Sequence, residues 1–244
     1  MKLVTPFFRR VGGNQGCPRR ICSILAATLI VVLPCSGRGQ ETRLSDWLLN
    51  HPAQDTEYPL GAIWSVPEQV PVQQGVLTQL LSELDAHAPI SANSRARLRG
   101  LLRELRVTGR VPLPLADARW LKANPARDPI IRPGETIYIP SRPQTVTVIT
   151  EEGIRCVVLH AAGRKVSDYV DACQARGVDW AWVAQPDGQI AKFGVATWNE
   201  QTEDEPAPGA WIWAPDRHSA LSQRFSEGFI YFLSTQGPAP DRPR

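Results

Sequence analysis

The segment PGETIYIP (residues 133–140) decides our reading of the fold, because PGAWIWAP (residues 208–215) repeats its pattern further along the chain. A second pair precedes each copy: RLSDWL (residues 43–48) resembles KVSDYV (residues 165–170). Both pairs occur in the same order. The simplest account is two copies of one small α+β unit, in which a helix lies on a mixed sheet that ends in the "PGxxIxxP" strand.

The second copy has the clearer strand pattern. Short runs of β-branched and aromatic residues predict two hairpins, one at residues 145–159 and one at residues 180–193, with a helix over 166–175 between them and a last strand at 211–213. Hairpin, helix and further strands are the order of a β-grasp. We therefore expect an α+β protein with two β-grasp-like domains, at residues 40–143 and 144–216.

Two helical patterns interrupt the first copy. Leucines recur at helical spacing over residues 73–86 and again over 91–105, and His87, Ala88 and Pro89 separate the two runs. We expect an antiparallel helical hairpin, inserted at about residues 68–106. Its arginine-rich outer face is expected to lie in solvent.

The chain is expected to end in an amphipathic helix within residues 217–236. Phe225, Phe229 and Phe232 lie on one stripe of that helix. The stripe either packs on the chain's own sheet or contacts a protein or membrane partner. The proline-rich residues 237–244 are expected to be disordered.

The N-terminus has the features of a secretory signal peptide over residues 1–37. Five basic residues precede an apolar run from Ile21 to Leu33. This run is too short to span a bilayer comfortably. Cleavage is expected after Gly37 or Gly39. Cys35 would be the acylated residue of a lipoprotein, but Pro34 stands where a small residue is expected, which argues against it. Without residues 1–37 the chain is weakly acidic, and no basic patch indicates nucleic-acid binding.

At this point the chain resembles a known family, the GfcC-like (YjbG-like) capsule and exopolysaccharide biosynthesis proteins. The residues that carry the resemblance are the leucine-rich hairpin followed by LRVTGR (residues 105–110), WVAQPDG (182–188), VATWN (195–199) and Pro208-Gly209. The resemblance implies a periplasmic protein with two β-grasp domains akin to those of outer-membrane polysaccharide export channels, and it implies no enzymatic activity. The family has a strand pair before its first helix, whereas here only a few residues separate the expected cleavage site from Leu44, so the first domain is expected to lack its opening hairpin.

The candidate binding residues are Arg110, Trp198 and Asn199, together with the three phenylalanines of the C-terminal helix. Arg110 matches the family's V-T-G-R, and a guanidinium suits carboxylates or phosphates. The alternative for Arg110 is a structural ion pair between domains. Trp180 and Trp182 share one strand face, as do Trp211 and Trp213, and we expect most of them to pack beneath the helix at 166–175.

An enzyme would need paired catalytic groups. The acidic cluster of Glu200, Glu203, Asp204 and Glu205 is the one candidate for glycosidic cleavage, and we favour a solvated acidic loop instead. No metal-ligand spacing or cofactor motif is present in the sequence. We therefore expect a non-enzymatic protein of exopolysaccharide secretion or assembly that binds a glycan or a component of the export machinery; the alternative is a polysaccharide-modifying enzyme.

Cys156 and Cys173 are the two cysteines beyond the signal segment. Helical spacing directs Cys173 towards the sheet, and strand alternation places Cys156 on one face of its strand. If that face is the covered one, the oxidising periplasm would join the two sulfurs. Two separate buried thiols remain the alternative, because spacing does not fix the strand register.

Overall fold

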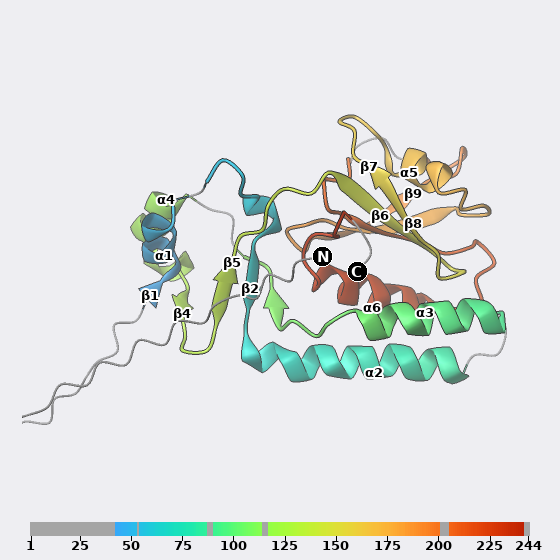
Figure 1. The fold of residues 1–244 in the computed structure, drawn as a ribbon, viewed down its shortest axis with the longest axis horizontal. Helices are drawn as coiled ribbons and strands as arrows, with labels where there is room; N and C mark the ends of the chain where they lie inside the picture. Colours follow the sequence, from blue (N-terminus) through green and yellow to red (C-terminus); the bar gives the residue numbers. More distant parts are fainter. Residues whose placement is uncertain (1–41, 53, 87–89, 114–116, 201–204, 242–244) are drawn as a thin grey trace, which may run out of the picture. The chain divides into compact units, whose positions relative to one another are not determined.

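The computed structural model describes residues 42–52, 54–86, 90–113, 117–200 and 205–241. Its largest sheet has five strands in the order β7-β6-β10-β8-β9 (Figure 1). The neighbours β10 and β6 run parallel, and all other pairs in this sheet are antiparallel. The strands are β6 (Thr145–Thr150), β7 (Arg155–Leu159), β8 (Trp180–Ala184), β9 (Ile190–Gly194) and β10 (Trp211–Ala214).

Helices cover both faces of this sheet. Helix α5 (Val166–Ala172) packs over Val146, Val148 and Ile212 on one face. On the other face, helix α6 (Gln223–Ser234) packs against Trp211 and Trp213. Because successive residues of a strand point to opposite faces, β10 supplies apolar side chains to both layers. The tryptophans of β10 therefore lie beneath α6 and not beneath the helix at 166–175, which corrects our expectation.

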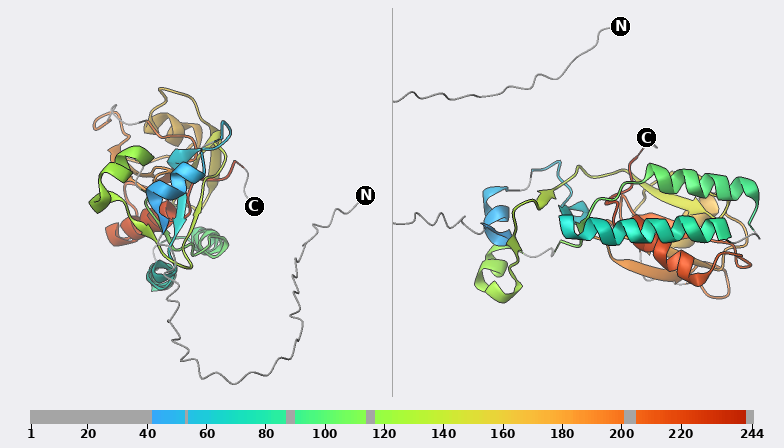
Figure 2. Two further views of the ribbon diagram at one scale, coloured as in Figure 1. Left: turned by 90° about the vertical axis from the view of Figure 1, so that its left-hand side faces the viewer. Right: turned by 90° about the horizontal axis from the view of Figure 1, so that it is seen from below.

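The helical hairpin consists of α2 (Val70–Ala86) and α3 (Ala92–Glu104). Helix α2 lies beside both α3 and α6, on the side of the sheet opposite α5 (Figure 2). It begins three residues before the expected start, since Pro71 is tolerated in a first turn where its missing N–H has no intrahelical partner. Ser91 caps α3 by accepting a hydrogen bond from the backbone N–H of Ser94.

The first sequence copy forms a smaller three-stranded sheet in the order β3-β2-β5. Leu44, Trp64, Leu113 and Leu121 are buried in its core. The elements of this part are β1 (Thr42–Arg43), α1 (Leu44–Asn50), β2 (Ile63–Ser65), β3 (Arg110–Val111), α4 (Ala118–Ala123), β4 (Ile130–Ile131), β5 (Thr136–Tyr138) and the 3₁₀ turns Pro59–Gly61, Pro67–Gln69 and Pro125–Arg127. β1 pairs with β4 outside that sheet.

The repeated sequences occupy matching places in the two sheets. Helices α1 and α5 begin at the corresponding residues Leu44 and Val166. Ser45 lies within the first turn of α1, and its hydroxyl donates to the carboxylate of Asp128 at 2.8 Å. The residue at the cap position is Arg43, and the corresponding residue of α5 is Lys165.

A disulfide joins Cys156 of β7 to Cys173 at the end of α5, with a Cα–Cα distance of 5.8 Å. This distance lies within the range that an unstrained bridge requires. Cys156 lies opposite Val148 in the β6–β7 pair, on the face that α5 covers. The bridge therefore ties an edge strand to the helix above it.

The C-terminal tail is ordered over residues 237–241, so our expectation of disorder is wrong there. Ala239 is fully buried, and its N–H donates to the carbonyl of Gly209 at 2.8 Å. The carboxylate of Asp241 accepts hydrogen bonds from the N–H of Gln144 and the hydroxyl of Thr145. The tail thus fastens the chain end beside β6 and β10.

The expected α+β class is confirmed: the described residues contain six α-helices and several sheets. Residues 40–244 form one compact unit by their internal contacts. The expected signal peptide and Cys35 lie outside the described residues. None of the helices in the described ranges is long and apolar enough to cross a bilayer.

Candidate functional site

A groove of about 360 Å³ lies over one side of the β8–β9 hairpin. We call it the tryptophan groove. β8 contributes Trp180 and Trp182, which share a face by strand alternation, and β9 contributes Lys192, directly opposite Trp182 in the register. The other lining residues come from three nearby loops and from the beginning of α6: Asp179, Trp198, Pro215, Asp216, Arg217, Ser219, Leu221, Gln223 and Ser226.

Lys192 lies against two indole rings. Its ammonium nitrogen is 4.9 Å from the ring centroid of Trp180 and 4.6 Å from that of Trp182. These distances fit cation–π contacts, which hold the ammonium without neutralising its charge. Lys192 forms no ion pair among the described residues. Its charge therefore remains available to a ligand.

Trp198 is the most exposed tryptophan of the groove, with 69% of its surface accessible. Its ring meets that of Trp180 edge to face, with centroids 6.5 Å apart. The neighbouring Asn199 holds the loop: its side-chain amide donates to the carbonyl of Asp179, and its side-chain oxygen accepts from the N–H of Ala196. Asn199 is thus a positioning residue, and Trp198 presents an open aromatic face.

The polar rim of the groove balances its charges internally. Arg217 lies 3.5 Å from the carboxylate of Asp179. One oxygen of Asp216 accepts the backbone N–H of His218. Ser219 and Gln223 add neutral hydrogen-bonding groups. An aromatic surface beside hydroxyl, amide and charged groups suits a ligand that has both C–H faces and many hydroxyls.

Arg110 lies elsewhere, and its guanidinium is occupied by main-chain oxygens. Its Nη1 donates to the carbonyl of Ser234 at 2.9 Å, and its Nη2 donates to the carbonyls of Ala62 and Pro186. The side chain is only 4% exposed. Both Nη atoms are thus engaged by main-chain carbonyls, the buried Nε has no hydrogen-bond partner, and Arg110 forms no ion pair among the described residues. The guanidinium instead connects β2, the β8–β9 turn and the end of α6.

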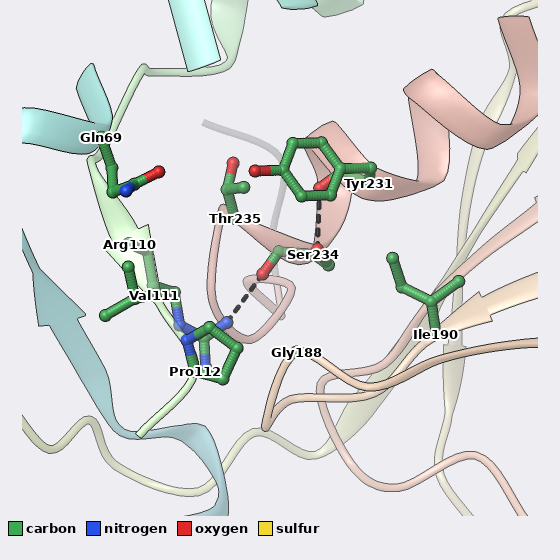
Figure 3. Close-up of a pocket in the computed structure, with 9 residues that line it drawn as sticks. All are labelled: Gln69, Arg110, Val111, Pro112, Gly188, Ile190, Tyr231, Ser234 and Thr235. Atoms are coloured by element: carbon green, nitrogen blue, oxygen red, sulfur yellow. Dashed lines mark hydrogen bonds between the residues drawn. The ribbon is translucent and has the colours of Figure 1, made fainter. Parts of the chain in front are cut away.

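A smaller pocket of about 230 Å³ adjoins Arg110 (Figure 3). Its walls include Tyr231 and Ser234 from α6 and Ile190 from β9, and Ser234 faces Arg110 across a hydrogen bond. Burial lowers the pKa of Arg110 to about 10, and the nearby Asp187 partly opposes the shift. The group therefore stays protonated at neutral pH, as its three acceptors require.

The three phenylalanines expected to meet a partner are buried. Phe225, Phe229 and Phe232 are each fully inaccessible and pack in the core between α6 and the five-stranded sheet. Trp213 lies between the first two, with its ring centroid 6.2 Å from Phe225 and 4.7 Å from Phe229. These residues form the core of the molecule, so the partner-binding interpretation of their side chains is wrong.

The acidic cluster is partly outside the described residues, which include Glu200 and Glu205 but not Glu203 or Asp204. Glu200 accepts a hydrogen bond from Ser167 at 2.7 Å and lies 3.5 Å from Lys165. These two partners lower its pKa below the usual carboxylate value. A general acid needs the opposite shift. No group of metal-binding side chains occurs among the residues that the structure describes.

Comparison with known proteins relates the chain to capsule biosynthesis proteins. Residues 155–228, which contain most of the five-stranded sheet and half of α6, match the family model for the C-terminal domain of GfcC, a capsule biosynthesis family. The chain is also 33% identical over 158 residues to an uncharacterised Escherichia coli K12 protein, YjbG. Over these ranges the chain is similar to the GfcC/YjbG-like proteins. It spans 62% of the length of YjbG, and the match covers 62% of the chain.

The tryptophan groove was only partly foreseen. Sequence reasoning selected Trp198 and Asn199 and missed Lys192, Asp179 and Arg217. The register of the expected 180–193 hairpin was the available signal, since it pairs Trp182 with Lys192 on one face. The Arg217–Asp179 contact joins separate loops, and no local pattern predicts such a pair.

Proposed function

We propose that the chain is a non-enzymatic periplasmic protein of capsule or exopolysaccharide assembly or secretion, and that it binds polysaccharide in the tryptophan groove. The observation that carries this proposal is the open ring of Trp198 beside Trp180, with the unpaired ammonium of Lys192 next to them. The family match supports the process, because its family is named for capsule biosynthesis.

The chemistry of the groove favours a saccharide. Sugar rings present C–H faces that pack on aromatic rings, and their hydroxyls need nearby donors and acceptors. Trp198 offers the aromatic ring. The hydrogen-bond donors and acceptors come from Ser219, Gln223 and the Arg217–Asp179 pair. Lys192 adds a point charge that would favour an acidic sugar unit.

The fold supports the expected β-grasp interpretation of residues 144–216. In the five-stranded sheet two hairpins flank the central strand β10, which runs parallel to β6, and helix α5 covers one face. This is the hairpin, helix and strand order that the sequence predicted. The first domain, residues 40–143, would be a partial version of the same unit, with the helical hairpin inserted between β2 and β3.

The cysteine bridge supports a periplasmic location, since such bonds persist in oxidising compartments. The lowered pKa of Glu200 argues against this residue as the general acid of a glycosidase, which must remain protonated. A polysaccharide-modifying enzyme is the alternative. A component of the export machinery is a further candidate partner.

Titration of the purified mature chain with oligosaccharides from the host's own exopolysaccharide tests the proposal. Binding should perturb the tryptophan fluorescence, and Trp198→Ala should weaken binding at least tenfold, equivalent to about 1.4 kcal/mol. Trp120→Ala is the matched control, because Trp120 is also exposed, at 45%, but lies on α4 outside the groove.

Two results would contradict the proposal. Equal binding by the Trp198 and Trp120 variants would remove the groove from the site. Release of new reducing ends by the wild-type protein, abolished in Glu200→Gln, would favour the enzyme.

A further inference from the structure

The strands β5 and β10 are counterparts in the two copies. Each follows a glycine with positive φ, +92° at Gly134 and +87° at Gly209. β5 pairs with β2 through Ile137 and Trp64, and β10 pairs with β8 through the corresponding Ile212 and Val183. The next pairs also correspond, Trp64 with Val111 and Val183 with Ala191. Three strands of each sheet therefore share one register.

The two strands differ at their other edge. β10 pairs there with β6, in parallel, through four register positions from Trp211↔Thr147 to Ala214↔Thr150. β5 ends its sheet, and no strand of the described residues pairs with that edge. Its outward N–H and C=O groups are thus arranged as a template for another strand.

The matching side chains also differ in exposure, because α6 covers this face of β10. Trp213 is fully buried, whereas its counterpart Tyr138 is 62% exposed. Trp211 is buried, and its counterpart Thr136 is exposed. The prolines that flank β5 do not block pairing, since Pro208 and Pro215 flank β10 at the same positions and β10 is paired.

We infer that the open edge of β5 binds an extended segment of a partner protein, which adds to the sheet parallel to β5 as β6 adds to β10. The second copy indicates the chemistry of the segment. β6 reads TVTVIT, in which every residue is β-branched, and all six residues are buried. Main-chain bonding supplies affinity in such strand addition, and alternate side chains supply specificity.

The segment comes from another chain because too little of this one precedes β1. In the second copy β6 and β7 occupy residues 145–159. With the cleavage that the sequence predicts, after Gly37 or Gly39, at most residues 38–41 remain before Thr42. Thr42 itself is paired with Ile131, and Arg43 donates to the carbonyl of Asp128 at 2.8 Å. The inference rests on that processing but not on the tryptophan groove.

The test adds a synthetic peptide of residues 144–151, which contains β6, to the mature full-length chain. Amide exchange at Thr136–Tyr138 should slow by about tenfold or more, while the rest of the chain is unchanged. A peptide with proline at positions 146 and 148 is the control, since it lacks the N–H groups that pairing needs. Tyr138→Lys, an exposed change, should weaken the protection and leave the melting temperature intact.

Three outcomes would overturn the inference. Equal exchange with and without the peptide would show that the edge accepts no strand. Protection of β5 in the free monomer would mean that the chain covers its own edge. Protection that rises with protein concentration alone would assign the edge to a second copy. The Trp198→Ala variant should respond to the peptide as wild type does, which separates this result from failure of the proposed function.

Discussion

At the scale of single residues, Arg110 shows how one buried charge organises distant main chain. Its three acceptors are carbonyl groups of residues 62, 186 and 234, and a carbonyl oxygen in such a place needs a donor. The preceding Gly109 is also required, because its φ is +67° and a Cβ there would lie 2.6 Å from the carbonyl oxygen of Val66. Gly109 and Arg110 thus act together to close the junction between β2, the β8–β9 turn and the end of α6.

Arg110→Met should therefore destabilise the protein by about 3 kcal/mol, since it leaves buried carbonyl groups without donors. Urea unfolding measures the loss. Arg119→Met on the exposed side of α4 is the control and should stay within about 0.5 kcal/mol of wild type. A variant that unfolds like wild type but fails in polysaccharide export would instead restore the ligand role that the sequence first suggested.

The sequence selected Arg110 and Trp198 for different reasons, and the structure separates them. Arg110 was recognised by a motif, which marks importance without saying whether the group binds a ligand or holds the fold. Lys192 was missed because a lone lysine on a strand has no local signature. Its environment depends on cross-strand pairing with Trp182, which requires the register.

At the scale of elements, the bridge between β7 and α5 holds the outermost strand of the large sheet. β7 pairs with only one strand, so its outer edge lacks the support of a neighbour. The bridge closes a loop with a sequence separation of 17. In the chain-entropy account such a loop stabilises the fold chiefly by restricting the unfolded chain.

Replacement of both cysteines, Cys156→Ser with Cys173→Ser, should lower the free energy of unfolding by roughly 3 kcal/mol. The reduced wild-type protein should match the double variant, and the double variant should not respond to reductant. Thiol counting on denatured, non-reduced protein from the periplasm provides the direct check. Two free thiols per chain would refute the bridge.

Long alternating or helical patterns predicted their elements well. The hairpins at 145–159 and 180–193 and the helix pair form close to the expected residues, because each buries a full apolar face. β2 and α4 were missed. β2 has three residues and α4 has six, and segments of that length carry too little periodicity to be distinguished from loops.

At the scale of the whole molecule, the two copies pack against each other more closely than two separate domains would. The hairpin inserted in the first copy packs on the sheet of the second, and residues 40–244 form one compact unit. The sequence repeats place the predicted domain boundary between residues 143 and 144. The sequence could not show that the core of the second copy includes Leu80, Leu98 and Leu102 from the first.

The exported chain should begin between residues 38 and 40 and carry no lipid. Mass spectrometry of protein isolated from the periplasm measures this directly. Cys35→Ser should leave the mass and the location of the mature protein unchanged. A mature chain that begins at an acylated Cys35 would instead tether the protein to a membrane.

The contacts of Arg110 also set the earliest moment at which the chain can complete its fold. They require residues 62, 110, 186 and 234 together, and the tail adds the N–H of Ala239 on Gly209. A chain made and translocated from its N-terminus reaches these last residues only at the end of synthesis. Until then the guanidinium lacks its acceptor on Ser234, so the junction stays incomplete. If the chain is exported unfolded, as we propose, this late completion separates transport from folding in time.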